Sequence, residues 1–511
     1  MKEQDETLRT AGRGGVAVLG AKVFFIVIGF VQQPLLRASI GLAGYGALSR
    51  VLSVANIVNN VVVSSSTQGV SRAVSRAPGH ERQALRATLR VHAPLAVGLA
   101  LAFAALAPLV AWFQHAPHIT WPLVVLSGVV LLYGLYAPLI GALNGQRQFT
   151  RQAALDVCFA VLRTTGRVGM GALFVSRGLP GPLGATLGFV VAAGCILPVA
   201  LRWTGLGQAG ETELVGKVYL AQLLPIAGAQ LFTNLLMQSD MTLLGRFLSL
   251  GAVAAGLGDG ARTSADEWVG VYRACQLFAF LPYQLLFSVT QVLFPMLARA
   301  RAENDWDAVR RYVARGARIG AILCGLLVCV VVALAESLLA FAYGADVGER
   351  GAAALRVLAL GQGAFAMMAL GTTVLTSLGR ERTSAVLTLG AVVAVVALCW
   401  LGVADAPFGA SQLVRTALAT SGALAVALGV AGVLVYRQTR AFVPLRTALR
   451  VGAAVLVCVG VGLVLPRVGR FATMGLAGGV AALYVAFLTL TGELGKEDLA
   501  VARAVLGRKG G

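Results

Sequence analysis

Polar side chains recur along one apolar stretch of this sequence, residues 268–297. Arg273, Gln276 and Gln284 belong to a series spaced by three or four residues, which places them on one face of a helix. A charged side chain at the centre of a bilayer costs roughly 2.5–3.5 kcal/mol, and unsatisfied polar groups in lipid cost several kcal/mol. We therefore expect this face to line a water-filled cavity. The alternatives are burial between helices, with Arg273 snorkelling to the nearby interface.

Other cationic side chains also interrupt apolar stretches, whereas Asp240 is the one clear acid in the N-terminal two thirds of these stretches. This excess of cations favours an anionic substrate, because phosphate groups pair strongly with arginine. An isolated acid such as Asp240 is expected to bind a cation, carry a proton or pair with an arginine, so we assign it a coupling role. The candidate substrate-binding residues are Lys22, Arg50, Arg163, Arg167, Arg273, Gln276 and Gln284.

The composition indicates which elements position these residues. The chain has 511 residues, of which 58% are hydrophobic and 13% are charged, whereas ordinary soluble domains have about 25% charged residues. Apolar stretches of roughly 20 residues, long enough to cross a bilayer as helices, repeat from end to end. The sequence predicts an all-α polytopic membrane protein with about fourteen spans, at 14–36, 42–67, 91–113, 120–143, 155–177, 183–202, 218–248, 268–297, 317–343, 352–378, 383–404, 412–436, 451–466 and 471–491.

The net charge of +20 indicates orientation. Most of the Lys and Arg residues fall in the two termini and in alternate loops, which is the positive-inside pattern. An even number of spans then places both termini in the cytoplasm of a multi-pass inner-membrane protein. We expect affinity for membrane lipids and no binding of nucleic acid.

An internal repeat predicts how the spans are grouped. Aligning 42–67 with 268–297 without gaps pairs Arg50 with Arg273, and it also pairs polar residues further along both spans. The two spans are six apart, so they cross the membrane in the same direction and suggest two pseudo-symmetric lobes around a central cavity. The predicted divisions are 1–217 for the first lobe, 218–450 for the second, and 451–511 for two additional spans and a tail.

No pattern in the sequence predicts an enzyme. There is no nucleotide-binding G-x-x-x-x-G-K-[ST] loop and no H-E-x-x-H pair, and the four histidines lie at or near loops. All seven cysteines fall in apolar spans and are typical of small hydrophobic residues. A secondary transporter remains, with no cofactor beyond a coupling Na⁺ or H⁺. The external segment 249–267 is rich in Gly and Ala, so we expect a mobile loop there.

Three motifs support a resemblance to a known family. Asp240 is followed by an apolar run and Gly245–Arg246, Gly270-x-Tyr272 opens the polar span, and Phe294–Pro295 precedes Arg299. The segment "GALNGQRQF", 141–149, adds a fourth similarity. Together these resemble the polysaccharide-export flippases of the MOP superfamily, which include oligosaccharide and O-antigen flippases, the sporulation stage V B type and the related lipid II flippases.

The resemblance implies a two-lobed transporter with a central, often cationic cavity. Its implied activity is to flip an anionic saccharide linked to polyisoprenyl phosphate across the bacterial inner membrane, alongside glycosyltransferases or a polymerase of the same pathway. Lys22, Arg50 and Arg273 occupy the spans whose basic residues surround pyrophosphate in lipid II flippases. Here the first of these spans has a single Lys, which leaves pyrophosphate specificity open. The alternatives are a MATE-like exporter of organic cations and a non-transporting membrane scaffold of a polysaccharide assembly complex.

Overall fold

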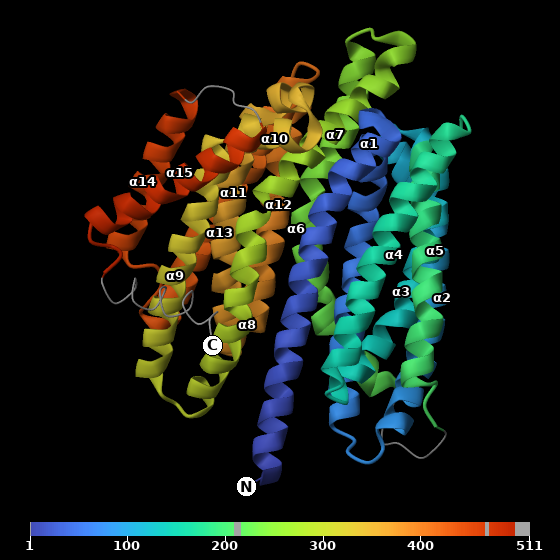
Figure 1. Ribbon diagram of the computed structural model, residues 1–511, viewed down its shortest axis with the longest axis vertical. Helices are drawn as coiled ribbons and strands as arrows, with labels where there is room; N and C mark the ends of the chain where they lie inside the picture. The colour runs from blue at the N-terminus through green and yellow to red at the C-terminus, as the bar shows by residue number, and fades with distance from the viewer. Residues whose placement is uncertain (1, 209–215, 465–469, 496–511) are drawn as a thin grey trace. The chain divides into compact units, whose positions relative to one another are not determined.

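The computed structural model describes residues 2–208, 216–464 and 470–495, and within these ranges the secondary structure is helical. Thirteen helical segments of the described chain are long and apolar enough to cross a membrane (Figure 1). The first of them, Val23–Ser75, contains two spans, which confirms the prediction of about fourteen. The side chain of Lys22 lies outside the described residues.

A single glycine divides the first long helical segment, α1 (Lys2–Ser75). Gly41 has φ 75° and ψ 170°, a backbone conformation that is open essentially to glycine alone. The helical hydrogen bonding is interrupted there, and the chain turns back on itself. The boundary predicted between the first two spans therefore has a local cause.

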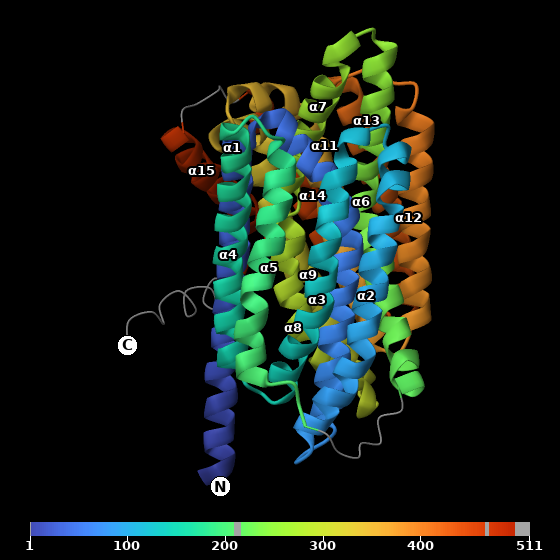
Figure 2. The same ribbon diagram turned by 90° about the vertical axis from the view of Figure 1, so that its right-hand side faces the viewer.

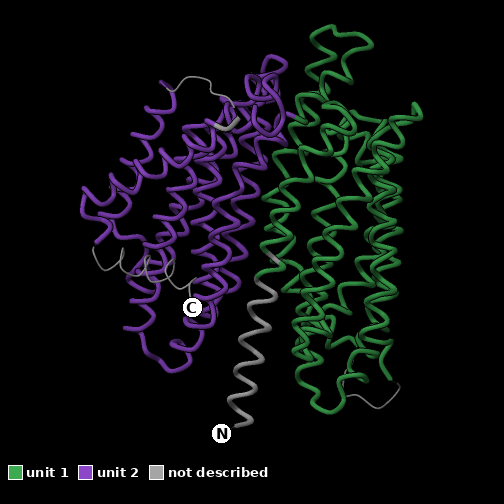
Figure 3. The backbone as a smooth tube through the Cα atoms, in the orientation of Figure 1, with its two compact units in different colours: residues 1–270 green, residues 271–511 purple. Residues whose placement is uncertain are grey.

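Two compact units divide the chain, residues 1–270 and 271–511 (Figure 3). In unit 1, the second half of α1 packs on α2, α3 and α6, while α4 and α5 pack on each other (Figure 2). The elements of unit 1 after α1 are α2 (Glu81–Phe113), the 3-10 helix η1 (Pro117–Ile119), α3 (Thr120–Gly145), α4 (Phe149–Ser176), α5 (Gly181–Thr204), α6 (Gly216–Ala254), η2 (Gly258–Gly260) and the first half of α7 (Ala261–Ala279).

Unit 2 is built around α9 and α11, which contact each other and most of the remaining helices. The last two helices, α14 and α15, pack on α9. The elements of unit 2 after α7 are α8 (Leu281–Ala302), α9 (Trp306–Ala333), α10 (Ala335–Tyr343), α11 (Ala345–Ser377), α12 (Glu381–Val403), α13 (Ala410–Thr439), α14 (Leu445–Val464) and α15 (Arg470–Leu490).

The units do not follow the predicted boundary at 217–218, because α6 packs on α1 and α2 within unit 1. The lobe boundaries 1–217, 218–450 and 451–511 remain a prediction.

The external segment 249–267 differs from the expected mobile loop. Helix α6 continues to Ala254, η2 follows, and α7 begins at Ala261, so most of the segment is helical. The polar span 268–297 is also not one helix: α7 ends at Ala279 and α8 begins at Leu281. Pro282 stands in the first turn of α8, where its missing N–H is tolerated, and it cannot donate the bond that would continue α7.

Candidate functional site

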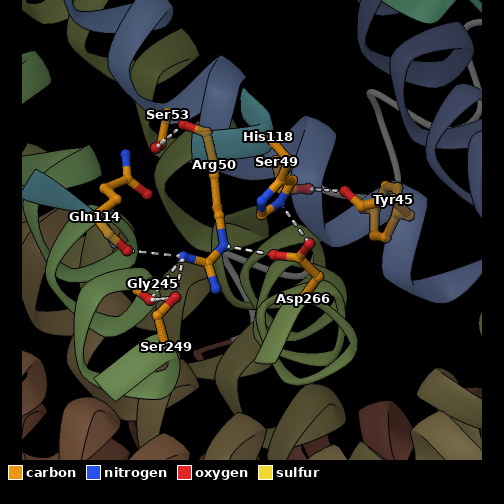
Figure 4. Close-up of polar contacts among 9 residues, drawn as sticks. All are labelled: Tyr45, Ser49, Arg50, Ser53, Gln114, His118, Gly245, Ser249 and Asp266. Carbon is orange, nitrogen blue, oxygen red and sulfur yellow. Dashed lines mark hydrogen bonds and ion pairs between the residues drawn. The ribbon is translucent and has the colours of Figure 1, made fainter. Parts of the chain in front are cut away.

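Arg50 lies in the second half of α1 and is completely buried, with 0% of its surface exposed. Its Nε is 2.8 Å from Oδ1 of Asp266, which forms an ion pair between α1 and α7 (Figure 4). Its Nη1 donates to the carbonyl of Gly245 at 2.7 Å and to Oγ of Ser249 at 3.0 Å, both in α6. One guanidinium therefore joins three helices of unit 1.

A histidine completes this arrangement. Nε2 of His118, in η1, lies 2.8 Å from Oδ2 of Asp266, so the carboxylate has a nitrogen partner at each oxygen (Figure 4). The side chain of Asp266 is 5% exposed and that of His118 is 10% exposed. We name Arg50, Asp266 and His118 the outer cluster, because the charge pattern predicts that the loop before α3 is on the external side.

Glycines allow α7 to approach α1 closely enough for this contact. A Cβ on Gly46 would lie 1.7 Å from the backbone oxygen of Asp266, and one on Gly270 would lie 2.8 Å from the carbonyl oxygen of Leu42. Only residues without a Cβ permit such separations between helices. In α6, a Cβ on Gly245 would lie 3.2 Å from Nη1 of Arg50, so this glycine clears space for the guanidinium.

The outer cluster keeps unused hydrogen-bonding capacity. Within the described part of the chain, buried Nη2 of Arg50 and Nδ1 of His118 have no hydrogen-bond partner. The amide group of Gln114, which is 0% exposed, has none either. Buried polar atoms that lack partners are uncommon and costly, and they are often found at functional sites. The cluster can therefore accept a further anionic or polar group at little additional desolvation cost.

Polar contacts continue from the outer cluster along the interface of α1 and α6. Oγ of Ser53 is 3.3 Å from Oγ1 of Thr242, and Nδ2 of Asn60 donates to Oδ1 of Asn234 at 2.7 Å. These pairs account for polar residues of the second span by contact between helices. In membranes such contacts contribute only about 0.6 kcal/mol each on average.

The predicted polar face of 268–297 divides across the break at Phe280. Arg273 is half-buried, and its Nη1 donates to Oε1 of fully buried Gln276 at 3.1 Å. Gln284 is half-buried on α8, beyond the break. Arg273 therefore has a different environment from Arg50, its partner in the sequence repeat.

Arg163 and Arg167 of α4 pack on aromatic rings. The guanidinium of Arg163 lies 4.3 Å from the ring centre of Phe25, and that of Arg167 lies 5.2 Å from the ring centre of Phe189. Such cation–π contacts can explain why these arginines lie inside a span even if they bind no substrate. Their assignment to substrate binding remains a prediction.

Asp240 is buried on α6, where it is 2% exposed and its Oδ1 accepts from the backbone N–H of Met241 at 2.7 Å. His92 also lies within a span, contrary to the expectation for the histidines. It is buried in α2, with Nε2 2.9 Å from the hydroxyl of Tyr219 and Nδ1 3.3 Å from Oγ of Ser66. In the described ranges, no group of three or more His, Cys, Asp or Glu side chains could hold a metal ion.

Sequence reasoning missed Asp266 and His118, which stand in segments assigned to loops. One signal was present: Asp266 precedes Gly270 by four residues and Arg273 by seven, the spacing of a single helix face. Extending the polar span by two residues, from 268 to 266, would have placed an acid on it.

Comparison with known proteins gives two family matches. A model described as polysaccharide biosynthesis protein matches residues 11–301, and the MatE model matches residues 261–401. Among curated proteins, no sequence matches the chain significantly.

Several solved structures share the fold at low sequence identity. The lipid II flippase MurJ, in an inward closed conformation, superposes with a TM-score of 0.72 at 13% identity, covering 93% of this chain and 98% of that one. A variant of the Vibrio cholerae MATE transporter VcmN gives 0.59 at 15% identity, covering 86% and 98%. A MOP-superfamily transporter from Pyrococcus furiosus gives 0.58 at 14% identity, covering 84% and 95%. The chain thus has the two-lobed helical fold of the MOP superfamily.

Proposed function

Because this chain belongs to the polysaccharide biosynthesis protein family, we propose that it flips a lipid-linked anionic saccharide across the bacterial inner membrane. Its headgroup would carry the phosphate of a polyisoprenyl carrier. Both termini would be cytoplasmic, and glycosyltransferases or a polymerase of the same pathway would supply and use the saccharide. The fold shared with a protein called lipid II flippase supports the proposal.

The observation that carries the proposal is the environment of Arg50. A membrane-buried guanidinium is balanced by one carboxylate, and its Nη2 has no partner among the described residues. The planar guanidinium group of an arginine can donate two hydrogen bonds to two oxygens of either a carboxylate or a phosphate, because both oxyanions fit its geometry. Asp266 therefore holds Arg50 in the position that a substrate phosphate would require.

Exchange of partners is the mechanism that we attach to this geometry. When α1 moves away from α6 and α7, phosphate oxygens replace the carboxylate of Asp266 at Arg50, and Asp266 keeps His118 as a partner. Each charged hydrogen bond is worth roughly 1.5–3 kcal/mol, so the exchange is close to balanced rather than strongly uphill. The transporter would then close again over a headgroup or over Asp266.

The remaining predicted residues take supporting roles. Arg273 and Gln276 on α7, with Gln284 on α8, would contact the phosphate and the sugar. Lys22 would meet the headgroup as it enters from the cytoplasm. Arg163 and Arg167 would add positive potential to the first lobe.

Asp240 is proposed to couple transport to an ion rather than to contact sugar. A buried carboxylate in a span can carry a proton or bind sodium. Transport by Asp240→Asn in reconstituted vesicles should depend differently on pH or sodium from transport by the native protein. An unchanged ion response in a normally folded variant would exclude this role.

A flipping assay in proteoliposomes tests the proposal. The probe is a fluorescent polyprenyl-phosphate-linked sugar, and the readout is the fraction of probe that reaches the other leaflet. The native protein should flip it faster than protein-free vesicles. The double variant Arg50→Met, Asp266→Leu should fold, since apolar replacement of a buried ion pair is often neutral or stabilising, yet flipping should fall at least about tenfold.

The control is Arg415→Met, which removes an exposed arginine of α13 whose side chain, among the described residues, bonds only to the carbonyl of Gly402 at 3.4 Å. It should flip normally. Full activity of the double variant would show that Arg50 has a purely structural role. No flipping by the native protein would contradict the proposed substrate.

An exporter of organic cations is the second candidate, favoured by the MatE match over residues 261–401. Such a protein needs a carboxylate available to the cation, whereas the carboxylate of Asp266 is neutralised by Arg50. Uptake of a cationic dye by the same proteoliposomes, lost in Asp240→Asn, would favour this candidate.

A further inference from the structure

Helices α12 and α13 of unit 2 are adjacent and joined by a short loop (Figure 2), and residues of both helices line a groove. Its volume is about 550 Å³. Small residues form its floor, and valines that are largely exposed, such as Val386 at 70% and Val426 at 67%, form its sides. The floor residues are Gly390, Ala391, Ala394, Ala423 and Ala427.

The length of the groove matches one leaflet of a bilayer. It extends along α12 from Arg382 to Ala394, which at 1.5 Å per residue is about 18 Å. Half of a hydrocarbon core of about 30 Å is roughly 15 Å. The groove thus begins at a membrane surface and ends near the mid-plane.

Only the surface end of the groove is polar. Arg382 and Thr383 line it there, and the rest of the lining is apolar. Arg380, Arg437 and Arg440 are exposed at the same ends of the two helices, against a single acid, Glu381. None of these four arginines has an ion pair or a side-chain hydrogen bond in the described part of the chain. Their charge is therefore available to an external anion.

We propose that this groove is a binding site for an anionic phospholipid of the inner leaflet. One acyl chain lies on the small-residue floor, and the phosphate contacts Arg382 and Thr383. Because lipid tails are as apolar as the groove, the chain gains little by leaving the bulk lipid. Preference must come from the headgroup, and each cation near an anionic surface contributes about fivefold in affinity.

The geometry favours a phospholipid over the polyisoprenyl carrier. A chain long enough to cross the bilayer would extend beyond a groove that ends near the mid-plane. The site is therefore independent of the proposed transport function, and its test does not use a transport assay.

Photo-crosslinking of the full-length protein in nanodiscs tests the site. The probe is phosphatidylglycerol with a diazirine on one acyl chain, and adducts are mapped by mass spectrometry. Labelling should concentrate on 386–394 and 423–434, and unlabelled phosphatidylglycerol should compete for it better than phosphatidylcholine. Arg382→Gln should lower this labelling about fivefold.

A second variant fills the groove. A Cβ on Gly390, which lines the groove, would meet no atom within 4 Å, and leucine favours the helix, so Gly390→Leu should direct its side chain into the groove. It should abolish labelling of the groove. The matched controls are Gly429→Leu, an equally open glycine of α13 outside the groove, and Arg446→Gln, an exposed arginine at the start of α14. Both should label as the native protein does.

Two results would overturn the proposal. Labelling spread evenly over all lipid-facing helices, or insensitive to headgroup charge and to Gly390→Leu, would indicate bulk lipid only. Preferential competition by a polyprenyl phosphate would assign the groove to the carrier chain and reject the phospholipid.

Discussion

Each of the two units contains a buried carboxylate bonded to arginine, and the two differ in how completely their polar atoms are satisfied. In unit 1, Asp266 pairs with Arg50, which is fully buried and keeps an Nη2 without a partner among the described residues. In unit 2, Glu493 follows α15 and is 4% exposed. We name Glu493, Arg318, Arg450 and Thr447 the inner clasp.

Both carboxylate oxygens of the inner clasp have partners, and among the described residues none of its buried side-chain atoms lacks one. Oε1 of Glu493 accepts from Nε of Arg318 at 2.9 Å and from Thr447 at 2.7 Å, and Oε2 accepts from Nη1 of Arg450 at 3.0 Å. Arg318 also donates to the carbonyl of Glu493. Both arginines remain about one third exposed, at 30% and 32%, so solvent shares the cost of their charge.

This difference separates a fixed contact from an exchangeable one. The inner clasp fastens α14 and α15 to α9, and in the described part of the chain it holds no buried donor without a partner. The outer cluster holds a desolvated cation with one counter-charge and spare donors, so a second anion can compete for it. Four predictions test the comparison.

Removal of Asp266 should have the largest effect. Asp266→Ala leaves the charge of Arg50 buried without a counter-ion, which typically costs 3–5 kcal/mol of unfolding free energy, as a rough guide. A thermal melt in detergent should show a large loss of stability. Adding Arg50→Met to this variant should recover most of it, and failure to recover would mean that Asp266 contributes by packing rather than by charge.

Gly46→Ala should have the second largest effect on stability. Its Cβ would lie 1.7 Å from the backbone oxygen of Asp266, so α7 must move away from α1. Overpacking of this kind costs about 1–3 kcal/mol. Gly98→Ala, on α2 with open space around the Cβ, is the control and should be neutral or slightly stabilising. A normal melting temperature for Gly46→Ala would contradict the close approach of α1 and α7.

Glu493→Gln should lower the free energy of unfolding by less, about 1–2 kcal/mol. The substitution removes two ion pairs whose arginines are partly solvated. The bond from Thr447 can persist with the amide oxygen. Flipping by this variant should equal that of the native protein at a temperature where both are folded. A specific loss of flipping would show that the inner clasp is more than a fastening.

The smallest effect concerns pH. Burial alone raises the pKa of Glu493, but the hydrogen bonds from Thr447, Arg318 and Arg450 outweigh it and lower the pKa below the ordinary value of 4.5. The stabilisation is therefore complete above about pH 4.5 and is lost as pH falls through the lower, folded-state pKa. The difference in melting temperature between native protein and Glu493→Gln should be constant from pH 7 to 5 and shrink below pH 4.5.

The class of fold and the number of spans were determined by the sequence alone. Apolar stretches of about 20 residues have only one way to satisfy their backbone in lipid, which is the helix, and the charge of the loops predicts their sides. The predicted spans 14–36 and 42–67 also leave Gly41 between them, where the structure breaks the helix. These properties depend on each stretch by itself.

Only the tertiary structure decided which polar residues meet. Arg50 and Arg273 are equivalent in the sequence repeat, yet Arg50 is paired with Asp266 and Arg273 donates to Gln276. Asp266 stood in a Gly- and Ala-rich segment whose composition indicates a loop, and it became buried because glycines let α7 lie directly on α1. The free energy of a buried charge depends on partners far away in the chain, and local patterns of residues carry no information about them.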